Sequence, residues 1–247
     1  MSLNRRHALT WLGLGLNAAA APALAQTQHG ATFAHGVASG DPLADRVVLW
    51  TRVTTAATAP VPVAWTVADG PDLKTIVARG QTEASPARDF TVKVDVTGLK
   101  PGKDYWFAFT VGEVTSPVGH TRTLPVGPSK DVVLAVVSCS LYPAGYFNAY
   151  DAVARLERLD AVVHLGDYIY EYGAGPDDYG TAGAAKMGRI LEPRHEIVTL
   201  ADYRLRHATY KTDPSLQAAH ARAPWIVVWD DHETANDSWI GGAENHA

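Results

Sequence analysis

The sequence predicts a β-sandwich followed by a partial α/β domain, behind a short N-terminal targeting segment. Short β-prone runs separated by Gly, Pro and Asp fill residues 32–124. Beyond residue 129, longer apolar runs alternate with segments of helical periodicity. This change of pattern places the sandwich at residues 31–125 and an α/β region with a mostly parallel sheet at residues 130–247.

Composition excludes several classes of protein. The 247 residues are 47% hydrophobic and 19% charged, which is too apolar for a disordered chain. The net charge of −5 argues against a nucleic-acid-binding surface, which would be basic. One cysteine excludes an intramolecular disulfide framework and a Cys-rich zinc site. No internal apolar run approaches the roughly 20 residues of a membrane span.

Residues 1–25 have the pattern of an export signal. Arg5 and Arg6 precede an apolar stretch over residues 8–21, and Ala23-Leu24-Ala25 offers a cleavage site after Ala25. The paired arginines resemble a twin-arginine signal, which implies the twin-arginine export machinery as a partner. Because glycines interrupt the short apolar stretch, we expect no permanent membrane anchor and a periplasmic or secreted protein.

The sandwich is expected to contain strands at residues 47–53, 61–67, 90–96 and 105–111. The turn before Tyr105 resembles the one that precedes a late strand in fibronectin-III sandwiches. In those domains an aromatic hydroxyl bonds back to the backbone of the turn.

The α/β region is expected to contain three continuous apolar strands, each buried on both faces. They occupy residues 131–137, 161–165 and 224–229, with helices predicted at residues 145–158, 200–209 and 215–223. Residues 168–196 form a long Gly-rich loop. His164 lies inside the second strand and is expected to be a satisfied core residue.

Each apolar strand runs directly into polar side chains that can ligate a metal. The clusters are Ser138-Cys139-Ser140, Gly166-Asp167-Tyr168-Ile169-Tyr170 and Asp230-Asp231-His232-Glu233. Loops at the carboxyl ends of parallel strands converge, so Cys139, Asp167, Tyr170, Asp231 and His232 are expected to share one site. Singly, a cysteine at a strand end is usually a small apolar residue, and Gly-Asp is often a turn or cap.

Thiolate, carboxylate and phenolate together would compensate a highly charged metal. A phenol has an ordinary pKa near 10, so its ionisation needs a strong Lewis acid, which favours ferric iron over zinc. Carboxylate oxygens suit a second, hard cation such as Ca²⁺. Two such metals can orient a phosphoryl group, and His232 is then placed to donate a proton to the leaving alkoxide or to bond the phosphoryl oxygen.

These motifs resemble the PhoD family of alkaline phosphatases. The shared strings are the twin-arginine signal, the sandwich entry at residues 33–42 and 45–52, the Ser138-Cys139-Ser140 strand end, residues 164–171, and Trp229-Asp-Asp-His-Glu233. The resemblance implies an immunoglobulin/fibronectin-III-like β-sandwich followed by a metallophosphoesterase domain similar to purple acid phosphatases. It also implies hydrolysis of phosphate mono- and diesters with Fe³⁺ and Ca²⁺.

The resemblance also implies roles for single residues. Cys139, Asp167 and Tyr170 resemble the iron ligands, with Asp167 bridging to calcium. Asp231 stands where related enzymes have a bridging Asn, and His232 stands where they have the catalytic His. Asn236 is a further candidate for a metal or phosphate contact. Tyr168 remains a rival to Tyr170, because two positions apart on a strand point the same way.

The family's catalytic domain continues well beyond Ala247 and supplies a late Asp and His as further ligands. The resemblance therefore implies a truncated metallophosphoesterase domain with an open sheet. Two alternatives stay open: a non-catalytic binding fragment with a vestigial metal site, and a zinc or manganese hydrolase that uses the same strand ends.

Overall fold

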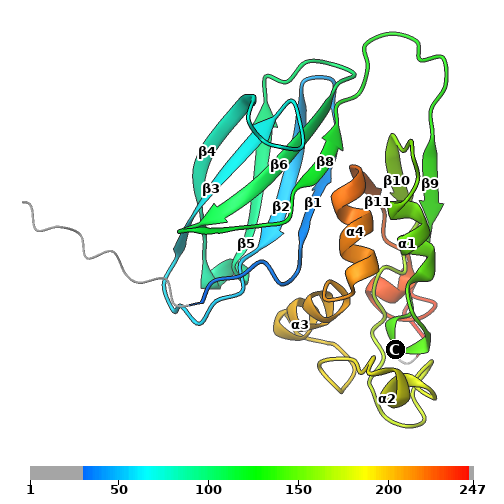
Figure 1. The fold of residues 1–247 in the computed structure, drawn as a ribbon. Helices are drawn as coiled ribbons and strands as arrows, with labels where there is room; N and C mark the ends of the chain where they lie inside the picture. Colours follow the sequence, from blue (N-terminus) through cyan, green and yellow to red (C-terminus); the bar gives the residue numbers. More distant parts are fainter. Residues whose placement is uncertain (1–29, 245–247) are drawn as a thin grey trace, which may run out of the picture.

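A computed structural model describes residues 30–244, and the predicted export signal lies outside the described residues. Two β-sheets and a group of short helices make up the fold (Figure 1). The strands are β1 (Val37–Gly40), β2 (Arg46–Arg52), β3 (Val61–Ala68), β4 (Ile76–Ala84), β5 (Thr91–Thr97), β6 (Asp104–Val111), β7 (Val114–Thr115), β8 (Gly119–Arg122), β9 (Leu134–Val137), β10 (Ala161–His164) and β11 (Trp225–Val227). The helices are η1 (Pro86–Arg88), η2 (Tyr142–Ala144), α1 (Asn148–Ala154), α2 (Ala184–Met187), α3 (Leu200–Tyr210), α4 (Pro214–Arg222) and η3 (Asp231–Glu233). None of the helices in the described range is long and apolar enough to cross a membrane.

The N-terminal half is a β-sandwich. One layer has the strand order β4-β3-β6-β7, with β8 also paired to β6, and the other contains β5, β2 and β1. Alternating residues of both layers point inward, so Leu49, Phe107 and Phe109 are completely buried between them. The four strands expected from the sequence here agree with β2, β3, β5 and β6 to within one residue at either end.

The turn before β6 has the predicted aromatic bond. The hydroxyl of Tyr105 accepts a hydrogen bond of 2.9 Å from the backbone amide of Lys100. The ring itself is buried in the sandwich. The side chain therefore ties the turn to the core, as it does in fibronectin-III domains.

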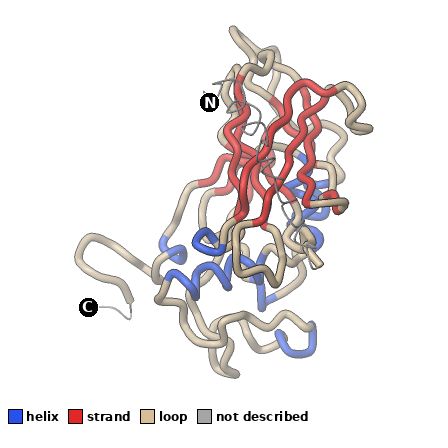
Figure 2. The backbone as a smooth tube through the Cα atoms, turned by 90° about the vertical axis from the view of Figure 1, so that its left-hand side faces the viewer, coloured by secondary structure: helices blue, strands red, loops and turns tan. Residues whose placement is uncertain are grey.

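The sandwich and the α/β region share one continuous sheet, which the sequence did not predict. Its order is β5-β2-β1-β11-β10-β9, and the junction is a parallel pairing of Gly40 in β1 with Trp225 in β11. A Cβ at position 40 would lie 2.9 Å from the carbonyl oxygen of Trp225, so only glycine permits this approach. In the view of Figure 2 the strands gather toward one end, and most of the helices and long loops lie toward the other.

Helices α1 and α4 cover one face of the α/β part of the sheet. Tyr150 of α1 and Leu216 of α4 pack with Val162 and Trp225 in a single core cluster. The helix predicted at residues 145–158 is shorter than expected and spans Asn148–Ala154.

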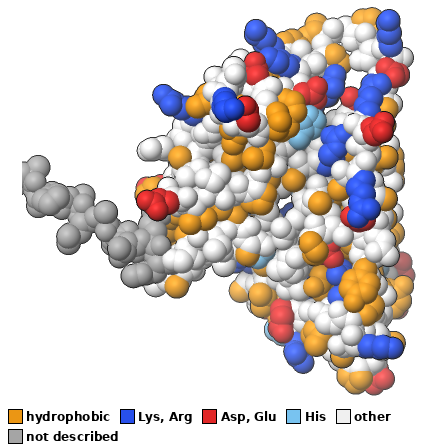
Figure 3. All heavy atoms as spheres, viewed as in Figure 1, with side chains coloured by type: hydrophobic (Ala, Val, Ile, Leu, Met, Phe, Trp, Pro, Cys, Tyr) orange, Lys and Arg blue, Asp and Glu red, His pale blue; other side chains and the backbone are white. Residues whose placement is uncertain are grey.

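Charged side chains of both signs are interspersed on the face drawn in Figure 3.

The prediction that the apolar strands are buried on both faces is wrong for β9 and β11. In β9, Leu134 is 49% exposed and Val136 is 60% exposed. Ile226 and Val227 of β11 are also exposed, whereas β10 in the middle is largely buried. Leu134, Val136 and Ile226 lie on the face away from the two helices, whereas Val227 is exposed because it lines a cavity beside Tyr168 and His220.

Candidate metal centre

The ends of β9, β10 and β11 bring the predicted residues together. Cys139 follows β9, Asp167 follows β10, and Asp231 and His232 lie in η3 after β11. Backbone hydrogen bonds join the first two loops, from Cys139 N to the Gly166 oxygen at 3.2 Å and from Ser140 N to the Asp167 oxygen at 2.8 Å. These three strands are parallel neighbours, so their carboxyl ends open at one edge of the sheet.

Asp167 is the centre of the group. Its Oδ2 lies 3.5 Å from the Sγ of Cys139 and 3.3 Å from the hydroxyl of Tyr170. Its Oδ1 is buried and has no hydrogen-bond partner among the described residues. Cys139 and Asp167 both have left-handed backbone conformations, with φ of 60° and 54°. Such strain in non-glycine residues concentrates at functional sites.

Asp231 and His232 complete the group. Asp167, Asp231 and His232 each offer one ligand atom, and these atoms lie within 4.8 Å of one another. Backbone amides hold the Asp231 carboxylate, from His232 at 3.0 Å and from Asp237 at 2.5 Å. We call Cys139, Asp167, Tyr170, Asp231 and His232 the Asp167 cluster.

The two rival tyrosines point in different directions. Tyr168 turns into the core, where its hydroxyl lies 2.8 Å from Nε2 of His220 and 3.0 Å from Nζ of Lys211. Tyr170 turns to Asp167, and its ring centre is 4.2 Å from that of His232. The expectation that both tyrosines point the same way is wrong, because residues 165–170 do not continue the strand.

Burial, followed by the charges of Asp167 and Cys139, raises the pKa of the Tyr170 phenol well above its ordinary value. The phenol therefore keeps its proton in this anionic setting. A cation at the same place would reverse that effect, because it favours the phenolate.

A buried glutamate orients His232. The carboxylate of Glu171 accepts hydrogen bonds from Nδ1 of His232 at 2.9 Å and from the backbone amide of Asn236 at 2.6 Å. The side-chain amide of Asn236 donates to Glu244, so the structure does not place that amide in the Asp167 cluster. Glu171 was not predicted as a site residue, although it follows Tyr170 directly in the sequence.

Glu233 joins two of the strand-end loops. Its carboxylate accepts from the amides of Asp167 at 3.0 Å, Tyr168 at 2.5 Å and Asp230 at 2.8 Å. At the same contact, a Cβ on Gly166 would lie 2.4 Å from Asp230 N. A glycine and a carboxylate thus permit the close approach that brings Asp167 to Asp231.

Arg206 shapes the loop that carries Tyr170. Its guanidinium is fully buried and, within residues 30–244, donates only to backbone carbonyl oxygens. These oxygens belong to Tyr170, Tyr172, Glu192, Pro193 and His195. An arginine in a predicted helix gives no sequence signal for this role, because its partners come from distant parts of a loop.

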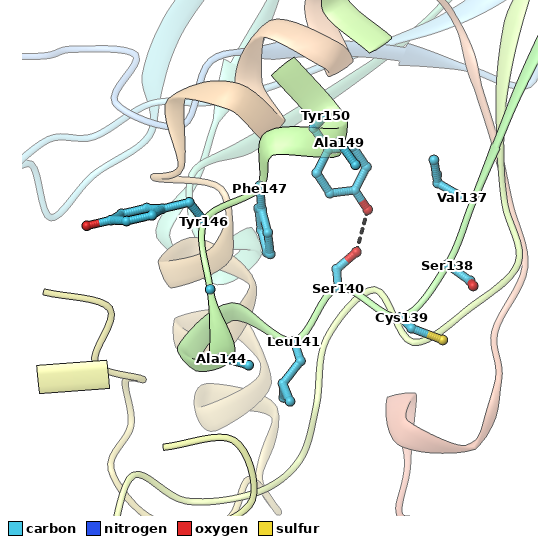
Figure 4. Close-up of a pocket in the computed structure, with 11 residues that line it drawn as sticks. Val137, Ser138, Cys139, Ser140, Leu141, Ala144, Tyr146, Phe147, Ala149 and Tyr150 are labelled. Carbon is cyan, nitrogen blue, oxygen red and sulfur yellow. Dashed lines mark hydrogen bonds between the residues drawn. The ribbon is translucent and has the colours of Figure 1, made fainter. Parts of the chain in front are cut away.

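A pocket of about 500 Å³ adjoins Cys139, between the end of β9 and α1. In Figure 4 the hydroxyl of Tyr150 points to Ser140, and the sulfur of Cys139 points away from both. The Tyr150 hydroxyl also lies 3.0 Å from Nε2 of His164. His164 is completely buried, which confirms the prediction of a satisfied core histidine.

The Asp167 cluster fits a metal ion. A thiol, two carboxylates, a phenol and an imidazole converge, and one buried carboxylate oxygen lacks a partner in the described chain. A buried, unpaired carboxylate oxygen is costly unless a donor or a cation satisfies it. Thiolate and phenolate favour a redox metal such as iron, whereas carboxylates also accept Ca²⁺.

Comparison with known proteins identifies the family. The family described as "PhoD-like phosphatase" matches residues 134–247, and "PhoD-like phosphatase, N-terminal domain" matches residues 18–125. The chain is 46% identical over 221 residues to alkaline phosphatase D of Bacillus subtilis (strain 168). The aligned region covers 83% of this chain and 36% of that protein. It also matches the solved structure titled "Structure of PhoD" with a TM-score of 0.74 and 44% identity, over 83% of this chain and 40% of that one. The chain therefore belongs to the PhoD-like phosphatase family.

Proposed function

We propose that the chain is the N-terminal part of an exported, metal-dependent phosphoesterase that acts as an alkaline phosphatase or phosphodiesterase. The observation that carries the proposal is the convergence of Cys139, Asp167 and Tyr170 around one unpaired carboxylate oxygen. Similarity to alkaline phosphatase D supports the reaction class. The chain spans 36% of that relative, so the activity of the whole enzyme belongs to this proposal.

Cys139, Asp167 and Tyr170 would hold ferric iron, and Asp167 with Asp231 would extend the site to Ca²⁺. Bound metals would supply Lewis acidity, which polarises a phosphoryl group and lowers the pKa of water. The chain holds the proposed ligands in place before a metal binds. The amides that bind Asp231 and Glu233 fix the loops, so the ligands need little rearrangement.

His232 would carry the proton transfer. Because Nδ1 is held by Glu171, Nε2 is the imidazole nitrogen left to serve Asp167 and Asp231 or a substrate. A carboxylate on Nδ1 stabilises the imidazolium and fixes the orientation of the ring. His232 can then protonate the alkoxide that leaves the phosphate ester, and Glu171 acts only through His232.

Export through the twin-arginine pathway is part of the proposal. Arg5-Arg6 and the small-residue site at Ala25 support it. Twin-arginine export carries folded proteins, which suits an enzyme that binds its metal before it crosses the membrane.

Iron binding tests the proposal directly. The purified chain should take up one Fe³⁺ and show a visible tyrosinate-to-iron absorption band. Tyr170→Phe should abolish the band, whereas Tyr172→Phe, which removes the next tyrosine hydroxyl in the loop, should keep it. Cys139→Ala and Asp167→Asn should each weaken iron binding by at least about tenfold, as expected when a metal ligand is lost.

Iron uptake without a visible band, or a band that survives Tyr170→Phe, would contradict the iron assignment. A stoichiometric zinc or manganese content with no iron would favour the hydrolase that uses those metals. No metal uptake by a folded chain would favour the non-catalytic fragment.

A further inference from the structure

A second group of polar side chains meets on the core side of the Tyr168 loop, away from the Asp167 cluster. The hydroxyl of Tyr168 lies 2.8 Å from Nε2 of His220 and 3.0 Å from Nζ of Lys211. Nζ of Lys211 is also 3.3 Å from Nε2 of His220. Lys211 directly follows α3 and His220 lies in α4, so three separate elements supply the group.

These three side chains line a cavity of about 290 Å³, which we call the Lys211 cavity. Its walls are mostly apolar or aromatic and include Ile169, Tyr203, Val227 and Trp229. Trp229 is 82% exposed and therefore lies at the entrance. Apolar walls with a few convergent polar groups are typical of small-molecule sites.

The charge in the Lys211 cavity is unbalanced. None of the ion pairs within the described residues involves Lys211, and its Nζ instead faces the rings of Trp50 at 4.7 Å and Tyr168 at 5.1 Å. Loss of contact with water lowers the pKa of Lys211 to about 7. Burial, and then the charge of Lys211, also lowers the pKa of His164 and of His220. These two imidazoles therefore stay neutral at pH 7.

The one carboxylate in the lining does not neutralise Lys211. Glu233 binds the amides of Asp167, Tyr168 and Asp230 with its two oxygens. His220 is also buried, at 7% exposure, and its Nδ1 has no hydrogen-bond partner in the described chain. The amine of Lys211 therefore faces the cavity without a carboxylate partner among the described residues.

We propose that the Lys211 cavity binds a small aromatic carboxylate. The carboxylate would pair with Lys211, and the ring would pack between the apolar wall and Trp229. A buried ammonium gains more from an anion than a surface lysine does, because little water screens the pair. The proposal does not depend on the function of the Asp167 cluster.

Fluorine NMR with 4-fluorobenzoate tests the proposal on the whole chain in EDTA. We expect 4-fluorobenzoate to bind saturably. The neutral probe 4-fluorobenzyl alcohol, which has the same shape, should bind with an affinity lower by about tenfold or more. Lys211→Met should weaken 4-fluorobenzoate binding by at least about tenfold, whereas Lys186→Met, on an exposed lysine, should have no effect.

Trp229→Ala serves as a second variant, because removing an exposed ring leaves the core intact. It should weaken binding several-fold, whereas Trp239→Ala, at another exposed tryptophan, should not. Asp167→Asn should bind the probe normally, which separates this site from the metal centre. Absence of binding at millimolar probe, equal binding of the neutral probe, or unchanged affinity in Lys211→Met would each overturn the proposal.

Discussion

The two ends of the shared sheet differ in how they are buried. At the sandwich end, Leu49 of β2 and Phe107 of the facing sheet are completely buried between two β-layers. At the α/β end, Leu134 is 49% exposed and Val136 is 60% exposed, because helices cover one face alone. One sheet thus has a closed core at one end and a half-covered layer at the other. The Asp167 cluster lies at the half-covered end, so the candidate chemistry and the closed core between two β-layers are in different halves.

Large-to-small substitutions at the two ends of the sheet should show the difference in burial most clearly. Phe107→Ala empties the closed core and should lower the free energy of unfolding by about 3–5 kcal/mol. Val136→Ala trims an exposed side chain and should change it by no more than about 0.5 kcal/mol. Urea denaturation measures both, and equal effects would show that the exposed face of β9 is covered in solution.

Acid should destabilise the α/β half first. Burial lowers the pKa of His164 to about 4 and that of His220 well below 6.5, whereas the sandwich has one such histidine, His35, with a pKa lowered to about 4. Between pH 4 and 6.5 the unfolded chain binds more protons at these sites than the folded chain does. Stability therefore rises with pH across that window and is lost as the pH falls.

Amide hydrogen exchange at pH 7 and pH 5 can measure this difference in each half. Protection in α1 and α4 should fall before protection in β2 and β6 does. His195→Asn is the matched control, because it removes an exposed histidine that pairs with Asp202 and leaves the buried histidines in place, so protection should still fall first in α1 and α4. Simultaneous loss of protection in both halves would mean that they unfold as one unit.

Tyr105→Phe should have the smallest effect. It removes the hydroxyl that binds the Lys100 amide and should cost about 1 kcal/mol, confined to the sandwich. Tyr179→Phe, at an exposed tyrosine, should cost nothing measurable. Thermal unfolding followed by circular dichroism provides the comparison, and a loss equal to that of Phe107→Ala would mean that the turn organises the whole core.

Much of the fold could be predicted because local patterns encode it. The alternation in residues 90–96 and the turn before Tyr105 depend on neighbouring residues, and both predictions agree with the structure. The exposure of Val136 could not be predicted in this way. A continuous apolar run indicates a strand, but only tertiary packing determines whether one face or two are covered.

The predicted gathering of Cys139, Asp167 and His232 rests on a general property of parallel strands, and the structure places these residues together. Their roles as ligands and proton donor remain predictions. The supporting residues could not be found, because Glu171 and Arg206 act through partners that only the folded loops bring near. Tyr168 and Tyr170 differ for the same reason, since an irregular backbone has no fixed side-chain period.

The pairing of Gly40 with Trp225 also determines the order in which the molecule can assemble. The two residues lie almost the whole described chain apart, so this contact must wait until β11 has left the ribosome. All the strands of the sandwich emerge much earlier and can pair among themselves. The sandwich can therefore form first, and β11 can then pair with its strand β1. A bulky residue at position 40 would then block the docking of β11 on β1, whereas the pairing of β3 with β6 does not involve this position.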